Sequence, residues 1–222
     1  MTECKKDYLI NIIRNMYPDK EIMFMYLCGA HVYGADDEDS DYDVSVMLKG
    51  FFGYMHMEVE NVDFFVYGED YYLEKQRLSP HVPLYNRAHM DEVIGIDSRL
   101  IYLNPNYKQE YECYKSVDFY KILPAFLKAF IEFHEIRYQV TDEPAKRLYH
   151  ILRIRGQLDN YDETGVFTLE CKEPWKSYYM NYKKNWQASV GPAYKYLIKE
   201  QLDYIKAYQE QLEVKHGLRN SD

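Results

Sequence analysis

The sequence predicts an α/β (α+β) protein in which a small β-sheet core with flanking helices is followed by a C-terminal helical bundle. Short apolar runs that end at glycine or at charged residues lie within residues 21–68 and are typical of strands. Apolar residues at helical spacing dominate residues 118–216. Because the composition changes near Ser116, we expect two domains, residues 1–115 and residues 116–222.

The elements of the first domain follow from apolar periodicity and from the residues that interrupt it. Apolar side chains recur at helical spacing before Pro18, which ends the first helix. Gly50 and Gly53 mark the turn after the second strand. The expected elements are a helix over 7–17, strands over 21–28, 43–48 and 55–66, a helix over 69–78, and short strands over 93–97 and 100–103.

Helices are expected throughout the second domain. Apolar residues follow helical spacing from Asp118 onward, with Pro124 inside the first run. The next helix should begin after Thr141 and Asp142, with Pro144 in its first turn, where proline is tolerated. The expected helices cover residues 118–140, 143–158, 174–186 and 192–216.

The most informative stretch leads from an apolar run through Gly29 and an acidic loop to Asp41 and Asp43. Alternate residues of a strand share a face, so these two carboxylates point the same way, with Cα atoms about 6 to 7 Å apart. Such carboxylates repel each other unless a positive charge lies between them. Mg²⁺ binds carboxylates together with substrate phosphates, and glycine lets backbone N–H groups approach a phosphate.

Two other interpretations compete with a magnesium site. The aspartates at 37, 39, 41 and 43 alternate as in an EF-hand calcium loop, which needs glycine at its sixth position and glutamate at its twelfth. Counted from Asp37, those positions hold Tyr42 and Leu48, so the EF-hand is excluded. A solvated acidic loop that leads into a strand stays as the alternative.

Asp63 is a candidate third ligand, because it lies between Val62 and Phe64 in an otherwise apolar run. A single carboxylate in a strand often faces solvent, and that interpretation stays open. Glu60 is a weaker candidate, since alternation places it on the opposite face.

A resemblance to a known family rests on eight residues: Gly29, Ala30, Tyr33, Gly34, Ser40, Asp41, Tyr42 and Asp43. They resemble the signature of the DNA polymerase beta superfamily of nucleotidyltransferases. They are most similar to the predicted nucleotidyltransferases of the RlaP type, which read roughly G-S-x-x-Y-G, a short spacer, and S-D-Y-D. One residue departs from the pattern: Ala30 stands where the family usually has a serine whose hydroxyl helps to hold a nucleotide phosphate.

The resemblance implies a small mixed sheet and the metal-dependent transfer of an NMP from an NTP such as ATP to an acceptor hydroxyl, with release of pyrophosphate. Asp41, Asp43 and Asp63 would be catalytic and would hold the metal, either Mg²⁺ or Mn²⁺. The nucleotide would be bound by Gly29, Ala30, His31, Gly34 and Ser40. The acceptor stays open among an RNA end, a protein and a small molecule.

Three further candidates for nucleotide binding lie on one face of an expected helix. Lys146, His150 and Arg153 occupy positions i, i+4 and i+7. A solvated face is one interpretation of this stripe. Similar proteins of the RlaP type have a K-x-x-x-H-x-x-R stretch in this region, which favours contact with the triphosphate or the acceptor.

The net charge of −9 is unevenly distributed. Residues 1–115 carry 11 Lys and Arg against 21 Asp and Glu, whereas residues 116–222 carry 16 against 15. An acidic surface repels nucleic acid, so we expect no extended DNA binding, although a short RNA end stays compatible.

The four cysteines form no C-x-x-C pair, the N-terminal residues lack a signal-peptide pattern, and no apolar run is long enough to span a membrane. We therefore expect a cytoplasmic protein that does not enter the membrane.

A second class of function stays open. The chain would then be a nucleotide-binding or antitoxin-like module with weak or no catalysis that acts through a protein partner. Ala30 favours this class, whereas the three aspartates oppose it. The usual partner in such an arrangement, a HEPN ribonuclease, has an R-x(4–6)-H motif that does not occur in this sequence, so the partner would be another protein.

Overall fold

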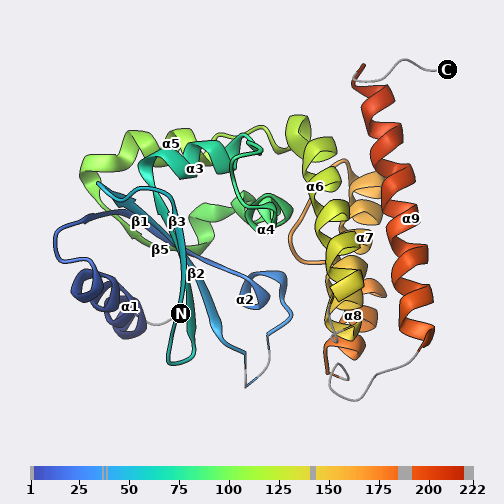
Figure 1. Cartoon of the computed structure of the whole chain (residues 1–222), viewed down its shortest axis with the longest axis horizontal. Coiled ribbons are helices and arrows are strands. Elements are labelled where there is room, and N and C mark those ends of the chain that lie inside the picture. The colour runs from blue at the N-terminus through green and yellow to red at the C-terminus, as the bar shows by residue number, and fades with distance from the viewer. Residues whose placement is uncertain (1–2, 37, 39, 141–143, 185–191, 218–222) are drawn as a thin grey trace. The chain divides into compact units, whose positions relative to one another are not determined.

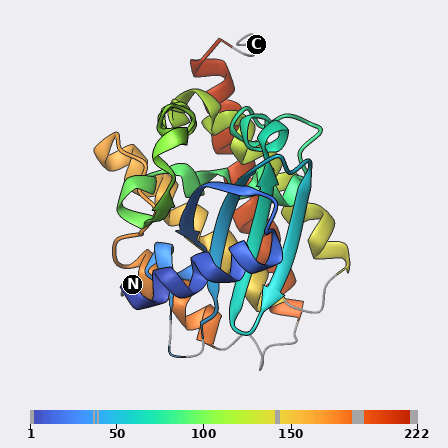
Figure 2. The same cartoon turned by 90° about the vertical axis from the view of Figure 1, so that its left-hand side faces the viewer.

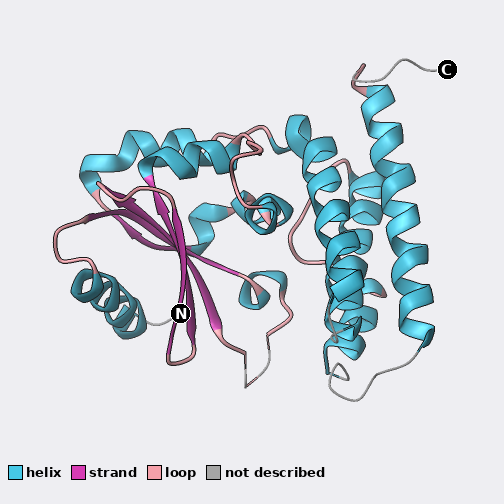
Figure 3. Ribbon diagram, in the orientation of Figure 1, coloured by secondary structure: helices cyan, strands magenta, loops and turns pink. Residues whose placement is uncertain are grey.

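The structure is a computed structural model of the 222-residue chain and describes residues 3–36, 38, 40–140, 144–184 and 192–217. It is a mixed α+β protein, as the sequence predicts (Figures 1 and 3). The chain divides into two compact units. The sheet unit comprises residues 1–82 and 92–118, and the helical unit comprises residues 83–91 and 119–222. The expected domain boundary after residue 115 stays a prediction.

The sheet unit contains a five-stranded mixed sheet with the strand order β3-β4-β2-β1-β5. Its strands are β1 (Glu21–Cys28), β2 (Tyr42–Lys49), β3 (Tyr54–Val59), β4 (Val62–Gly68) and β5 (Leu100–Leu103). β2 and β4 pair in parallel, and the other neighbours pair antiparallel. The first strand has the predicted bounds, and the second is one residue longer than predicted at each end.

The single strand predicted over residues 55–66 is wrong, because this segment forms a hairpin. Val59 of β3 faces Val62 of β4 across a loop of only Glu60 and Asn61. Glu60 adopts a φ of 56°, in the left-handed region that non-glycine residues rarely occupy. The hydroxyl of Tyr8 donates a hydrogen bond of 2.7 Å to the Glu60 carboxylate. Since no glycine or proline marks this loop, the sequence pattern alone predicts one continuous strand.

One face of the sheet packs against α1 (Glu3–Met16), which lies across the strands in Figure 2. Leu9 and Ile13 of α1 are fully buried, and they belong to the same apolar core as Val44 and Val46 of β2. The helix predicted over 7–17 is thus confirmed, with four additional residues at its start. Its apolar stripe explains why it covers the sheet.

The opposite face of the sheet packs against α3 (Glu69–Gln76) and α5 (Lys108–Lys115). The ring of Phe24 in β1 contacts Tyr72, Tyr111 and Tyr114, with ring centroids 5.3–6.0 Å apart. Many of the tyrosines in this unit therefore serve as packing residues that keep a polar tip.

The segment before β5 differs from the prediction. The short strand expected over 93–97 is wrong, because this segment forms the 3₁₀ helices η1 (Met90–Val93) and η2 (Ile96–Arg99), joined at Gly95. Gly95 has a φ of 65°, a conformation that a strand residue does not adopt. The strand expected over 100–103 is confirmed as β5, and η3 (Pro105–Tyr107) follows it.

The helical unit contains α4 (Leu84–Ala88), α6 (Phe119–Val140), α7 (Pro144–Thr164), α8 (Trp175–Lys184) and α9 (Pro192–Lys215). The helices predicted for the second domain are present, and α7 continues to Thr164 instead of ending at residue 158. The expected start of α7 at Thr141 and Asp142 lies outside the described residues.

The core of the helical unit is formed by buried apolar residues of α6, α7 and α9: Phe126, Phe130, Ile151, Ile154, Leu158, Ile198 and Ile205. Gly156 allows α7 to lie close to α8, since a Cβ at this position would be 2.6 Å from the Cβ of Trp175. In the part of the chain that the structure describes, no helix combines the length and the apolar character needed to cross a membrane.

Candidate functional site

The candidate site begins where β1 ends in a tight turn. Gly29 precedes the four-residue helix α2 (Ala30–Tyr33), and Gly34 ends it in the left-handed conformation. Gly29 itself has a φ of 69°, and a Cβ added there would lie 1.7 Å from Oδ2 of Asp43. The carboxylate of Asp43 therefore lies directly against the turn, in space that only glycine leaves open.

Asp43 is the electrostatic centre of the site. Its pKa is raised to about 7, first by burial and then by repulsion from the carboxylates of Glu92, Asp41 and Asp63. A hydrogen bond from the backbone N–H of Ala30 acts in the opposite direction. Four carboxylates thus concentrate negative charge at this end of the sheet.

Asp63 lies beside Asp43 because β2 and β4 are parallel and in register at these two residues. Residues paired across neighbouring strands point to the same face, so the two carboxylates share one face of the sheet. Oδ1 of Asp63 lies 2.8 Å from Nε2 of His56 on β3. The His56 ring in turn stacks on Phe65, with centroids 4.9 Å apart. His56 was not predicted, because its proximity to Asp63 depends on the unexpected hairpin.

The remaining predicted residues of the acidic stretch lie at the start of β2. Asp41 directly precedes this strand and is exposed, and Ser40 is half-buried. Asp37 and Asp39 lie outside the described residues. Asp41 is close enough to Asp43 to raise the pKa of its carboxyl group.

His31 stacks on Tyr42, with ring centroids 4.2 Å apart. Its Nδ1 lies 3.2 Å from Oδ2 of Asp36, and Nζ of Lys5 lies 3.3 Å from the centroid of the Tyr42 ring. Because successive strand residues point to opposite faces, Tyr42 and Asp43 diverge from each other. The structure therefore brings His31 to Tyr42 and not to Asp43.

The predicted stripe Lys146, His150 and Arg153 lies on α7 of the helical unit. Lys146 is exposed, whereas Arg153 is fully buried, with Nη1 only 2.6 Å from Oδ2 of Asp91. Burial, together with His89 and Arg153, lowers the pKa of His150 well below its usual value. The stripe is not a uniformly solvated face, because only one of its three side chains is exposed.

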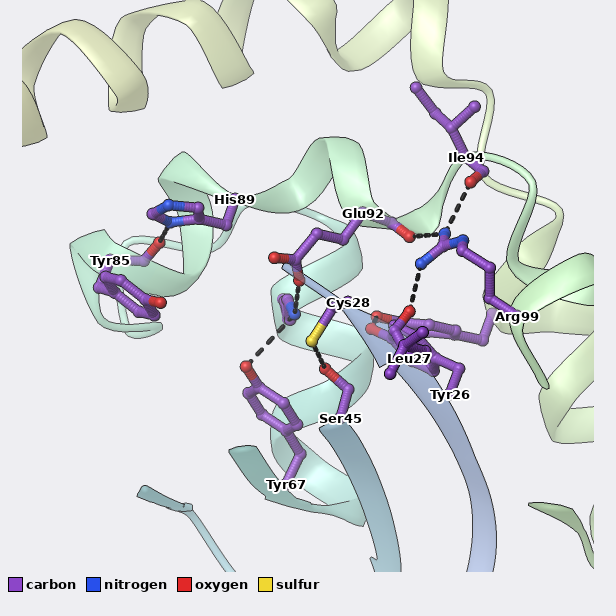
Figure 4. A network of polar contacts seen from close by, with 12 residues as sticks. Tyr26, Leu27, Cys28, Ser45, Tyr67, Tyr85, His89, Glu92, Ile94 and Arg99 are labelled. Atoms are coloured by element: carbon purple, nitrogen blue, oxygen red, sulfur yellow. Dashed lines mark hydrogen bonds and ion pairs between the residues drawn. The ribbon is translucent and has the colours of Figure 1, made fainter. Parts of the chain in front are cut away.

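Two buried residues near the acidic cluster were not predicted, namely Glu92 of η1 and Lys75 of α3. Nζ of Lys75 lies 4.0 Å from Oε2 of Glu92, and Figure 4 shows Glu92 near Tyr67 and Cys28. Glu92 is in a segment without clear periodicity, so no sequence signal distinguishes it from a surface glutamate.

The cluster fits a hard divalent cation in charge and in donor type. Asp41, Asp43 and Asp63 supply only carboxylate oxygens, which Mg²⁺ prefers, and a cation would relieve the repulsion that raises the pKa of Asp43. Among the described residues, no three His, Cys, Asp or Glu side chains are already arranged as ligands of a metal ion.

Comparisons with known proteins find likenesses among solved structures alone. No protein-family model matches the chain, and no curated protein matches its sequence. Among solved structures, a nucleotidyltransferase-like protein from Exiguobacterium sibiricum 255-15 is similar, with a TM-score of 0.31 and 9% sequence identity. The alignment covers 98% of this chain and 81% of that chain.

Proposed function

We propose that the chain is a metal-dependent nucleotidyltransferase, which transfers an NMP from an NTP to an acceptor hydroxyl and releases pyrophosphate. The observation that supports this proposal most is the pairing of Asp43 with Asp63 on parallel strands, directly against the Gly29 turn. Carboxylates that adjoin a glycine turn combine metal ligands with a surface that a phosphate can approach.

Nucleotidyl transfer depends on charge neutralisation and in-line alignment of the reacting groups. Asp41, Asp43 and Asp63 would hold Mg²⁺ or Mn²⁺, which would offset the charge of the phosphate oxygens and favour ionisation of the acceptor hydroxyl. The acceptor oxygen forms a bond to the α-phosphorus while the bond to pyrophosphate breaks. The carboxylate of Asp63 takes the proton of the hydroxyl.

The Gly29–Gly34 turn would bind phosphates of the NTP. The N–H groups of Val32, Tyr33 and Ala35 already donate to carbonyl oxygens within this turn. The N–H of Ala30 donates to the carboxylate of Asp43, so a phosphate bound at the Gly29 end of the turn would have to displace that carboxylate from it. At position 30 the chain offers only backbone groups, because alanine has no hydroxyl.

Substitution of the acidic pair provides the first test. We expect wild-type protein to bind at least one NTP in the presence of Mg²⁺, and the double variant Asp41→Asn, Asp43→Asn to lose Mg²⁺-dependent binding. The double variant should keep the fold, because asparagine at position 43 can still accept the hydrogen bond from Ala30. Calorimetric titration of each NTP, with circular dichroism to verify folding, measures both effects.

The control removes the same number of charges at a distant place in the chain. Glu200 and Asp203 are exposed residues of α9, and the double variant Glu200→Gln, Asp203→Asn should bind nucleotide as the wild type does. Equal binding by the Asp41, Asp43 variant and the wild type would disprove the proposed metal site.

Catalysis is tested with labelled NTPs and Mg²⁺, with and without RNA and protein extracts. Pyrophosphate release together with label on RNA, on a protein or on a small molecule would identify the acceptor class. Nucleotide binding without transfer would favour the alternative, a nucleotide-binding or antitoxin-like module that acts through a protein partner, which the missing hydroxyl at Ala30 favours. The cytoplasmic location stays a prediction.

A further inference from the structure

A chain of buried polar contacts lies within the sheet unit, close to the acidic cluster. Lys75, Glu92 and Tyr33 are 1%, 8% and 2% exposed, and they come from α3, η1 and α2. Nζ of Lys75 donates to the hydroxyl of Tyr67 at 3.3 Å and lies 4.0 Å from Oε2 of Glu92. The hydroxyl of Tyr33 donates to Oε1 of the same carboxylate at 3.3 Å. Buried charges of this kind are rare unless they are paired.

Tyr33 connects this chain of contacts to the candidate phosphate-binding turn. It is the last residue of α2, and Ala30 at the start of the same helix donates its N–H to Asp43. The short helix is therefore held at both ends by carboxylates. Asp43 fixes its first residue, and Glu92 fixes its last.

Glu92 is itself fixed by Arg99 (Figure 4). The Arg99 guanidinium donates to the backbone carbonyl oxygens of Glu92 and Ile94, and also to that of Leu27 at 2.6 Å. Leu27 lies two residues before Gly29, near the end of β1. Arg99 thus connects the segment that contains Glu92, through hydrogen bonds, to strand β1, which leads into the turn.

We infer that Glu92 is a positioning residue for the Gly29–Gly34 turn, and that Lys75 is the buried cation that offsets the charge of Glu92. Glu92 acts on the turn through the hydroxyl of Tyr33 and does not itself contact the substrate. This inference rests on the proposed function, because the turn is the place where the NTP phosphates would bind.

A purely structural role is the competing explanation, since a buried ion pair can simply belong to the core. The two roles predict different nucleotide affinities for a variant that loses the hydrogen bond between Tyr33 and Glu92 but keeps the ion pair between Lys75 and Glu92. Tyr33→Phe makes this change, because it removes the hydroxyl and no charge.

The matched control is Tyr111→Phe. Tyr111 is also a buried tyrosine of the sheet unit, 2% exposed, and its hydroxyl donates to Oδ1 of Asp97 at 2.6 Å. Both substitutions therefore remove one hydrogen bond between a buried tyrosine and a carboxylate. Only Tyr33 lies in the turn.

The experiment titrates the NTP that the wild type binds most tightly into the wild type and into each variant, with Mg²⁺ present. It also records the melting temperature of each protein. We expect Tyr33→Phe to weaken NTP binding roughly three- to tenfold, the effect of one hydrogen bond, and Tyr111→Phe to leave binding within twofold of the wild type. Both variants should melt at similarly lowered temperatures.

A second variant keeps the inference testable if Tyr33→Phe is poorly folded. Glu92→Gln retains an oxygen that can accept from Tyr33, so it should bind the NTP more tightly than Glu92→Ala does. If Tyr33→Phe and Glu92→Ala both bind the NTP as the wild type does, the positioning role is overturned while the proposed function stands. If the wild type binds no NTP with Mg²⁺, the proposed function fails and this inference fails with it.

Discussion

At the scale of single residues, Gly29 leaves room for a carboxylate of the chain itself. Glycine at this position was expected to let a phosphate approach the backbone. In the structure, the space that a side chain would fill is taken by the carboxylate of Asp43, since a Cβ would lie 1.7 Å from its Oδ2. The absence of a side chain at Gly29 therefore allows a carboxylate of the chain itself to be packed against the turn.

The packing of Asp43 leads to a prediction about stability and pH in metal-free protein. The pKa of Asp43 is about 7 in the folded state, above the ordinary value of 3.8 that applies in the unfolded state. The folded state therefore binds the proton more tightly, and its stability falls as the pH rises from about 4 to 7, by up to about 1.4 kcal/mol per pH unit from this group. Asp43→Asn should remove this pH-dependent loss of stability, because asparagine does not titrate.

The measurement is thermal unfolding of wild type and Asp43→Asn in EDTA at pH 5, 6, 7 and 8. We expect the melting temperature of the variant to exceed that of the wild type by an amount that grows up to about pH 7 and then levels off. A difference that does not change with pH would contradict the assignment of the raised pKa to Asp43.

At the scale of elements, α6 and α7 of the helical unit carry buried histidines. His134 is 1% exposed, and neither ring nitrogen has a hydrogen-bond partner among the described residues. Burial, together with Arg147 and His89, lowers the pKa of His134 well below its usual value. The pKa of His150 on α7 is lowered in the same way. Both rings are therefore neutral in the folded protein at pH 7.

Since the unfolded chain binds protons to these histidines more readily, their contribution to stability is present above the unfolded pKa, about 6.5, and is lost as the pH falls below it. We predict that His134→Leu reduces the drop in melting temperature between pH 7.5 and pH 5. The exposed His81 serves as the control, because His81→Gln should leave that drop unchanged. An equal drop in wild type and His134→Leu would show that protonation of His134 does not drive acid unfolding.

At the scale of the whole molecule, the stripe on α7 combines one surface residue with one core residue. Arg153→Ala leaves Asp91 buried without its ion-pair partner, so we expect it to cost about 3 to 5 kcal/mol in the free energy of unfolding. Lys146→Ala changes an exposed residue and should cost less than about 0.5 kcal/mol. Chemical denaturation of both variants measures these costs.

Lys146→Ala is consequently the informative variant for nucleotide binding. If Lys146 contacts the triphosphate, the variant should bind the NTP more weakly, and added salt should narrow its difference from the wild type. Titrations at two salt concentrations decide this point. Wild-type affinity of the variant at low salt would exclude such a contact.

The sequence predicts the α+β class and most elements, because apolar periodicity, glycine and proline act locally. It does not predict the hairpin at Glu60, since the loop of Glu60 and Asn61 contains no glycine or proline. It also does not predict the ion pair between Arg153 and Asp91, which are 62 residues apart in the chain. Pairing of Asp43 with Asp63 could be proposed from the resemblance to a family, but His56 and Glu92 depend on tertiary contacts that periodicity does not encode.

The parallel pairing of β2 with β4 has a consequence for insertions and deletions in related genes. Asp43 and Asp63 meet because the chain leaves β2, forms β3 at the edge of the sheet and returns as β4 beside β2. Residues added to the loop at Glu60 and Asn61 would lengthen the hairpin tip and leave this register intact. A single residue inserted between Asp63 and Phe64 would instead move either Asp63 or the rest of β4 to the opposite face. Length variation should therefore be common at the tip of the hairpin and absent from the first residues of β4.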